Sequence, residues 1–360
     1  MQNFSFRGLE IHSSRMWQWD SILRTLDFMR KTGLNALILH QNDILDEIVM
    51  PSVYFHDQEL VWKRWPVRRS KTYANAVYLS QIIKRAKSFG IDVYLEVKEI
   101  WYPEAILELF PELRDSHGVI CPTNPFWFSF LEAKTREAID ILPDLAGIIV
   151  SPATRESKVS ISTRTCACDR CQRTSGEEWY RQYIKAIFTP LAEKQKTLVV
   201  RDFSYTADQQ DALINAVKSC SDQIVLALKN VPHDFWPTFP TNERIGQTPE
   251  LREWIEFDVW GQYCGIGLFP CSLAEDLQKR ILYCLQKGAV GAIFRTDWEI
   301  CNDASNFNSF NMLNLFAAAM LSSRPDTHLD SVYQAWAEYG LSSPFHTESE
   351  AMEPVVPQNA

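Results

Sequence analysis

Eight short apolar runs alternate with amphipathic segments along this chain of 360 residues. Strand-like runs that alternate with helical patterns are typical of α/β proteins with a parallel sheet. Glycine ends three of the helical segments, at Gly33, Gly90 and Gly288, because it adopts the left-handed conformation that stops a helix. The expected strands are residues 7–12, 36–40, 92–99, 147–151, 197–203, 224–229, 254–263 and 291–296. The expected helices between them are residues 19–32, 74–89, 125–141, 177–194, 208–219 and 273–287.

This pattern predicts an α/β fold, a (β/α)8 TIM barrel with a short C-terminal helical extension. An open, doubly wound sheet is the alternative, and it is disfavoured because no glycine-rich phosphate loop follows an early strand. We expect one catalytic barrel over residues 1–325, a packing helix over residues 326–341 and a disordered tail over residues 342–360.

Composition excludes several classes of partner. The net charge is −9 and the pI is near 5.4, so no basic surface for nucleic acid is expected. No run reaches the roughly 18 apolar residues of a membrane span, and the N-terminus lacks the pattern of a signal peptide. Together with nine cysteines, an odd number, these features predict reduced thiols and a cytoplasmic location. A homo-oligomer is compatible with the sequence.

Two long loops follow the second and fourth expected strands. Residues 42–72 include a basic, tryptophan-rich stretch at 62–69, and residues 154–175 include three cysteines. Active sites of barrels are built from the loops at the carboxyl ends of the strands. The stretch 62–69 is therefore either a lid over an acidic sugar or a solvated surface.

Ionisable residues fall at positions that should face the barrel axis. On the seventh strand an apolar face of Phe257 and Val259 should pack against the helices, because side chains alternate along a strand. Its other face is polar and should point inward. Buried ion pairs among such residues are the alternative to a wet site. The inward residues by this parity are Glu256, Asp258, Trp260 and Gln262, and on other strands Glu10, His12, Glu96, Lys98, Arg295 and Asp297.

Residues 226–270 carry the clearest functional signal. The stretches LALKNVPHDFWP and EWIEFDVWGQYCG place carboxylates, tryptophans and an amide where two strands end. Carboxylates transfer protons, and aromatic faces and amides hold sugar rings. This combination predicts a carbohydrate site. Four tryptophans near strand ends could stack on a sugar, although packing is the commoner fate of each: Trp101, Trp236, Trp260 and Trp298.

The same stretches resemble a known family. LKNVPHDFWP and IEFDVWGQYCG are similar to the region of the xylan-type α-glucuronidases that reads roughly "IKNGPIDFQ … ELQITQEYTGQ". RGLEIHSSRMWQWDSILRTLDFMRKTGLNALILHQND resembles the opening strand and helix of that family, and YLSQIIKRAKSFGIDVYLEV resembles its third strand with the preceding helix. The resemblance covers about residues 7–270 and again implies a (β/α)8 barrel.

Members of that family are inverting exo-glycosidases. The resemblance implies a glycoside hydrolase that removes a terminal sugar, for example a uronic acid, from an imported oligosaccharide with two carboxyl groups. It places the base at Asp234 and a general acid just after the fourth strand, where Glu156 is the nearest candidate. A second family carboxylate falls on Gln262, whose amide cannot act as a base. Asp258 is the fallback base, with a partnership with Arg295 as its alternative role.

Other residues are candidates for substrate binding. Arg201 is predicted either to hold a substrate carboxylate or to pair internally with Asp202. The complete binding set is His12, Lys98, Trp101, Arg201, Lys229, Trp236, Glu256, Trp260, Gln262, Arg295, Asp297 and Trp298.

Two other functions remain open. A barrel that has lost a carboxylate at Gln262 would bind carbohydrate without cleaving it. A metal-assisted isomerase or lyase is the other, and the lack of a clear inward set of histidine and carboxylate ligands argues against it. No catalytic cofactor is expected.

Cys166, Cys168 and Cys171 place three thiols in six residues. Such spacing can ligate Zn²⁺ if a fourth ligand folds back, for example Cys121. The zinc would be structural and would hold the long loop after the fourth strand. The alternatives are reduced thiols without a metal, or redox chemistry in the loop.

Overall fold

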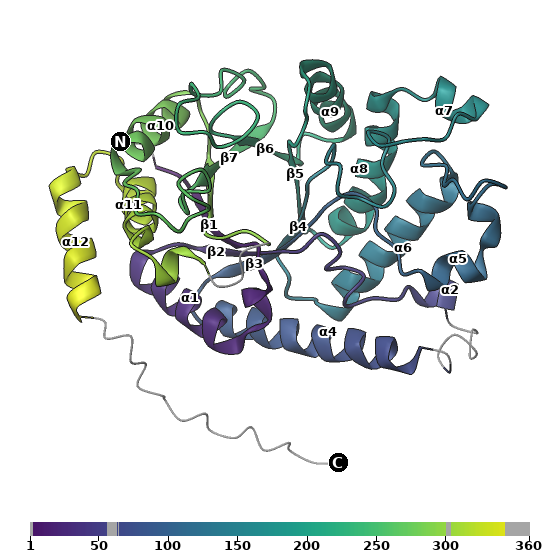
Figure 1. The fold of residues 1–360 in the computed structure, drawn as a ribbon, viewed down its shortest axis with the longest axis horizontal. Helices are drawn as coiled ribbons and strands as arrows, with labels where there is room; N and C mark the ends of the chain where they lie inside the picture. The colour runs from purple at the N-terminus through teal and green to yellow at the C-terminus, as the bar shows by residue number, and fades with distance from the viewer. Residues whose placement is uncertain (1–2, 56–62, 64, 300–303, 343–360) are drawn as a thin grey trace, which may run out of the picture.

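The strands of the computed structural model, which describes residues 3–55, 63, 65–299 and 304–342, close into one parallel barrel in chain order. The first strand pairs with the second and with the eighth, where Glu10 lies opposite Arg295. The predicted (β/α)8 barrel is confirmed (Figure 1). The strands are β1 Phe6–Ile11, β2 Ala36–His40, β3 Asp92–Val97, β4 Gly147–Val150, β5 Thr197–Arg201, β6 Val225–Lys229, β7 Arg252–Asp258 and β8 Gly291–Arg295.

Helices surround the barrel. Residues 230–251, all of them described, join β6 to β7 by turns without a helix. The long helices are α1 Trp19–Thr32, α4 Pro66–Lys87, α6 Pro125–Ile141, α8 Gly176–Glu193, α9 Ala207–Cys220, α10 Ala274–Gln286, α11 Met312–Ser323 and α12 Leu329–Ser342. The short ones are α2 Ser52–Phe55, α5 Ala105–Leu109 and α7 Asp169–Arg173, with 3-10 turns at Ser14–Trp17, Pro111–Leu113 and Asn306–Asn308.

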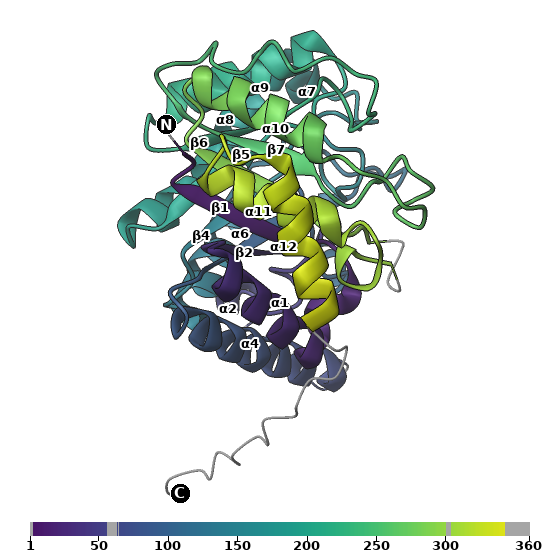
Figure 2. The ribbon, with the colours of Figure 1, turned by 90° about the vertical axis from the view of Figure 1, so that its left-hand side faces the viewer.

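Helix α12 lies along the outside of α11 and α1 (Figure 2). The ring of Tyr339 meets the edges of Phe28 and Phe316, with centroids 6.1 and 4.8 Å away. The proposed division of the chain at 325 stays a prediction, and residues 343–360 of the expected tail lie outside the described residues.

Two predicted boundaries differ from the structure by more than two residues, and several others differ by one or two. Strand β7 ends at Asp258 rather than at 263, because the Asp258 carboxylate accepts the N–H groups of Trp260 and Gln262, at 3.1 and 2.8 Å, and turns the chain. Helix α4 begins at Pro66 rather than at 74, since proline suits the first turn of a helix. The expected loop 42–72 therefore ends in a helix. Trp62 and Arg64 of its basic stretch lie outside the described residues.

The barrel interior has two layers. The lower layer is apolar and includes Tyr94, Ile149, Val199, Trp254 and Ile293. Above it, toward the carboxyl ends of the strands, the inward positions are ionisable, as the alternation of side chains predicts. We call the rim at these carboxyl ends the mouth.

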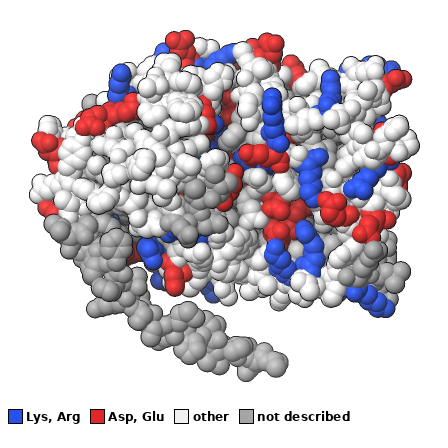
Figure 3. Space-filling view, in the orientation of Figure 1, with Lys and Arg blue, Asp and Glu red and all other residues white. Residues whose placement is uncertain are grey.

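The outer surface is mixed in charge. Acidic and basic side chains are interspersed on the face shown in Figure 3. None of the described helices combines the length and the hydropathy that crossing a bilayer requires.

Candidate active site

An ionic layer closes the barrel just below the mouth, with Arg201 at its centre. The guanidinium of Arg201 donates to both Glu256 and Glu96, with Nε 2.7 Å from Glu256 Oε2, and it lies 3.4 Å from Glu10. All four side chains are at most 1% exposed. Arg201 thus forms the internal ion pair, and its partners are glutamates rather than Asp202. Arg201 and Glu256 were candidates for substrate contact, but both are enclosed beneath the mouth and hold each other.

Burial changes the pKa of one carboxyl group in this layer. It raises the pKa of Glu96 to about 7, although the positive charge of Arg201 acts to lower it. Ser151 at the end of β4 donates to Glu96 over 2.5 Å.

Two buried histidines lie beside the ionic layer. The rings of His12 and His40 stack with centroids 3.5 Å apart, and His40 Nδ1 lies 2.8 Å from Glu10 Oε1. Burial holds the pKa of both histidines well below the usual range. Glu10, His12 and His40 form a group whose atoms are close enough to share a metal ion, contrary to the expectation that no inward histidine and carboxylate set exists. Parallel stacking directs the two rings' lone pairs side by side, which does not suit one shared ion.

Two lysines at the mouth flank one phenyl ring. Lys98 Nζ and Lys229 Nζ lie 4.2 and 4.4 Å from the centre of the Phe203 ring. Lys98 contacts Glu156 over 3.3 Å, and Lys229 contacts Asp234 over 3.1 Å. The two carboxylates predicted as acid and base are therefore held from the loops after β4 and β6 around a common ring.

Asp234 sits in a dense set of contacts. The Tyr263 hydroxyl donates to Asp234, and the Tyr263 ring stacks on Trp236 with centroids 3.8 Å apart. Burial alone would raise the pKa of Asp234, but the Lys229 ammonium and the Tyr263 hydroxyl outweigh it and lower the pKa. Asp234 is therefore ionised at neutral pH. Trp236 is 47% exposed and offers a free aromatic surface beside it.

Backbone strain occurs at both of these loops. His233 has φ +63° immediately before Asp234, and Ala153 has φ +68° just after β4. Left-handed backbone is costly for residues other than glycine and clusters at functional sites. The Ala153 N–H donates to Glu99 over 2.9 Å, which helps to fix the second of these turns.

The turn after β7 presents an amide to the mouth. Arg295 donates to the Gln262 side-chain oxygen over 2.9 Å. Asp258 supports this turn through the backbone, and burial raises its pKa to about 6 despite the nearby charge of Arg295. Its carboxylate thus has a structural task, and a role as fallback base stays a prediction.

Glu299, which the sequence reasoning missed, also reaches the mouth. Its carboxylate lies 3.3 Å from His12 Nδ1 and is 34% exposed, and burial raises its pKa. Asp297 is buried instead and accepts the His12 N–H and the Ser13 hydroxyl. Every second residue along β8 faces inward, so extending this alternation from residues 295 and 297 to 299 would have found Glu299. The same alternation on β2 would have found His40.

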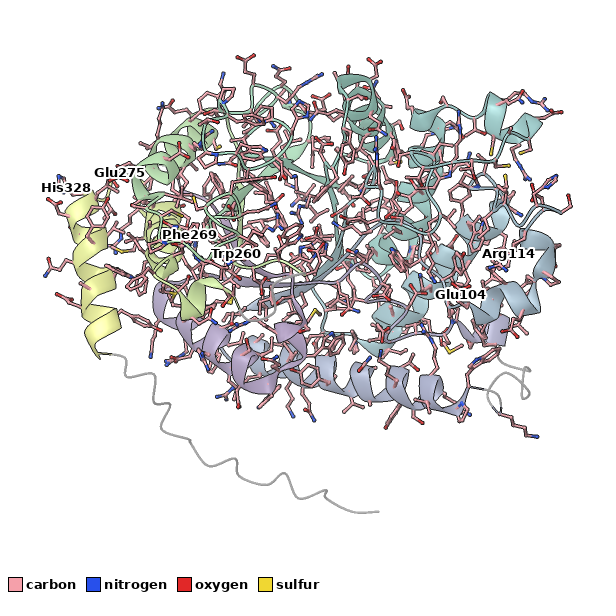
Figure 4. All side chains as sticks on the ribbon, in the orientation of Figure 1. Glu104, Arg114, Trp260, Phe269, Glu275 and His328 are labelled. Carbon is pink, nitrogen blue, oxygen red and sulfur yellow. The ribbon has the colours of Figure 1, made fainter. Side chains whose placement is uncertain are left out.

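The predicted tryptophans divide into two groups. Trp260 is fully buried against the backbone of Gly267, in the loop between β7 and α10 that also carries Phe269 (Figure 4). It cannot stack on a sugar, because no face of its ring is free. Trp101 and Trp298 are half-buried and keep this role as a prediction.

A cavity of about 500 Å³ opens beside Lys229. Residues after β5 and β6 line it, among them Asp202, Gln210, His233, Asn242 and Arg244. The cavity reaches Lys229 and His233, next to the candidate base, but Asp234 itself is not among the residues that line it.

The cysteines lie apart from the mouth. Cys166, Cys168 and Cys171, on and before α7, meet Cys121 from the loop before α6, with all four sulfur atoms within 4.8 Å of one another. The structure thus brings the suggested fourth residue to the cluster.

Comparisons with known proteins identify the fold class. No family model and no curated protein matches the chain. A solved glycoside hydrolase of family 138 that targets pectin rhamnogalacturonan II is 12% identical with a TM-score of 0.63, over 95% of this chain and 42% of that enzyme. A β-N-acetylhexosaminidase from Bacteroides fragilis is 15% identical with a TM-score of 0.60, over 94% and 70% of the two chains.

A third structure extends the same likeness. An inactive mutant of a family 20 exo-β-N-acetylglucosaminidase from Vibrio harveyi is 13% identical with a TM-score of 0.58, over 94% of this chain and 58% of that one. Identities this low establish a shared barrel fold with glycoside hydrolases. The chain spans less than half of the first of these enzymes. The finer resemblance to xylan-type α-glucuronidases stays a prediction.

Proposed function

We propose that this chain is a glycoside hydrolase that removes a terminal sugar from an oligosaccharide with two carboxyl groups at the barrel mouth. The observation that carries the proposal is the setting of Asp234, an ionised carboxylate held by Lys229 and Tyr263 beside the exposed face of Trp236. A carboxylate next to an aromatic platform suits a base that activates water against a stacked sugar. The barrel fold shared with glycoside hydrolases supports it.

Two residues are candidates for the general acid. Glu156 is the one implied by the family resemblance, and its partner Lys98 lies near the same Phe203 ring as Lys229, the partner of Asp234. Burial raises the pKa of Glu299, which is the direction that a general acid requires. An acid and a base with pKa values moved in opposite directions divide the work of inversion between them.

The sugar class that we favour is a uronic acid. Lys98, Lys229 and Arg295 are all at most 9% exposed and bring three positive charges to the mouth. Partly desolvated cations bind a carboxylate more strongly than exposed ones do.

The first experiment screens aryl glycosides, including an α-glucuronide, against the wild type and Asp234→Asn. We expect turnover of an aryl uronide and a fall in kcat of roughly 100- to 10,000-fold in the variant. NMR of the first product formed should show the inverted anomer. The matched control is Asp140→Asn, which removes a surface aspartate that pairs with Lys194 over 2.9 Å and should retain full activity. Equal rates for wild type and Asp234→Asn would remove Asp234 from the mechanism.

Leaving groups distinguish the two acids. Loss of the acid slows substrates with poor leaving groups and spares activated aryl groups, which depart without a proton. Glu156→Gln and Glu299→Gln should therefore differ, and only one should show this selective loss. If the wild type turns over no glycoside in the screen but binds oligosaccharides in calorimetry, the chain is a non-catalytic carbohydrate-binding barrel.

A further inference from the structure

Four cysteines from two loops converge at the outer side of the barrel. Cys121 Sγ lies 3.7 Å from Cys168 Sγ and 3.5 Å from Cys171 Sγ. Cys166 completes a group in which all sulfur atoms lie within 4.8 Å of one another. All four are free thiols. We propose that these four cysteines bind one zinc ion in a tetrahedral, purely structural site.

The spacing of the sulfur atoms fits a metal better than a disulfide. Zinc–sulfur bonds of about 2.3 Å in a tetrahedron place neighbouring sulfur atoms about 3.8 Å apart. A disulfide requires about 2.05 Å between the two atoms. The separations of 3.5 and 3.7 Å are close to the tetrahedral value. Four thiolates without a carboxylate or histidine leave no open position, which is the pattern of a structural site and not of a catalytic one.

The sequence spacing and the hydrogen bonds around the sulfur atoms agree with this assignment. Cys168 and Cys171 are separated by two residues, and the Cys171 N–H points to Cys168 Sγ at 3.5 Å, as in loops that hold zinc through paired cysteines. The Thr123 hydroxyl lies 3.1 Å from Cys121 Sγ and 3.3 Å from Cys171 Sγ. Groups of this kind orient ligands around a metal.

A bound ion would also restrain a long loop of this fold. Residues 151–175 join β4 to α8 and contain one short helix, α7, which lies on the outer side of α8 (Figure 1). The near end of this segment carries Glu156 at the mouth, where the Ser157 hydroxyl accepts the Glu99 N–H over 3.0 Å. The far end carries three of the thiols. Cys121 belongs to a different loop, so a bound ion would cross-link the two loops and restrict the segment from both ends.

Metal analysis tests the proposal directly. The full chain, purified without a histidine tag under reducing conditions, should contain one zinc ion per chain by mass spectrometry of elements. Cobalt exchanged into the site should give the intense sulfur-to-cobalt charge-transfer bands and the d–d bands of tetrahedral thiolate coordination. Cys121→Ser and Cys171→Ser should each lower zinc content at least tenfold. Cys220→Ser and Cys284→Ser change free cysteines outside the cluster and should retain it.

Several results would overturn the site. These are a reduced wild-type chain that takes up neither zinc nor cobalt, a cobalt spectrum without sulfur charge transfer, and disulfides among the four residues by mass spectrometry. Iron in place of zinc in chain from zinc-supplemented cells would also overturn it. The cobalt spectrum of the wild type decides the matter even if a cysteine variant fails to fold. None of these readouts depends on glycosidase activity, so they stand apart from the proposed function.

Discussion

Arg201 shows what a buried charge demands of its surroundings. Its guanidinium contacts Glu96 and Glu256 and lies near Glu10, and none of these groups reaches solvent. Removing one partner of a buried ionic group costs about 3–5 kcal/mol, because the remaining charge is left uncompensated. We expect Arg201→Met to lower the free energy of unfolding by about this amount in urea denaturation at pH 7.5. Arg30→Met breaks a half-exposed pair with Asp27 and should cost less than about 1 kcal/mol; similar losses for both would argue against the network.

Glu99 makes the stability of the folded protein depend on pH, and a single substitution can isolate its contribution. Burial raises its pKa to about 7 in the folded chain, above the value of about 4.3 in an unfolded one. The folded state therefore binds the proton more tightly, and the contribution of Glu99 to stability falls as pH rises from about 4 to about 7. Glu99→Gln cannot ionise, so it should gain on the order of 3 kcal/mol relative to wild type between pH 4.5 and 8. Melting curves across this range measure the difference, and parallel curves for the two proteins would contradict it.

At the scale of elements, one asparagine organises the loop after β7. Asn311 is fully buried and donates to the carbonyl groups of Trp260, Gly267 and Phe269, at 2.9, 3.3 and 3.1 Å, and it accepts the Cys271 N–H over 2.9 Å. Replacing its amide by Leu removes this partner from the four backbone groups, at a cost of about 1–3 kcal/mol for each group that stays dry.

We expect Asn311→Leu to increase hydrogen exchange across residues 259–271 and to raise KM, because Gln262 and Tyr263 lie in this loop. Gln334→Leu removes an exposed amide on α12 that donates to Glu338 over 2.8 Å, and it should leave both readouts unchanged. Protection of the loop in Asn311→Leu would show that other contacts hold it.

The elements themselves were largely predictable, because alternation and glycine stops are local signals. The end of β7 was not predictable. The Asp258 side chain accepts the N–H of Trp260, two residues later, and turns the chain, while apolar and polar residues continue to alternate past that point. The same holds within the site. Parity along the strands located Glu96, Arg295 and Asp297, but it does not tell a buried partner such as Glu256 from a group at the surface of the mouth. Only the packing of loops from different strands separates them.

At the scale of the molecule, the N-terminal segment closes the ring. Phe4 is fully buried, and its N–H donates to the Ser322 carbonyl at the end of α11 over 3.2 Å, just before β1 pairs with β2 and β8. Phe4→Ala should lower the free energy of unfolding by about 3–5 kcal/mol, through the cavity that it leaves. Phe310→Ala, at a side chain 72% exposed, should change it by less than about 0.5 kcal/mol. Equal effects in urea denaturation would show that Phe4 does not help to close the barrel.

The ionic layer also limits which amino-acid exchanges can accumulate in the barrel during evolution. A barrel lined with aliphatic residues absorbs single exchanges one at a time, because its neighbours shift by fractions of an ångström. Here an exchange at Arg201 leaves three buried acids without their shared cation, and an exchange at Glu96 or Glu256 leaves guanidinium N–H groups buried without an acceptor. Descendants should therefore keep these positions together or replace them in concert, so that natural variation among them occurs as linked sets.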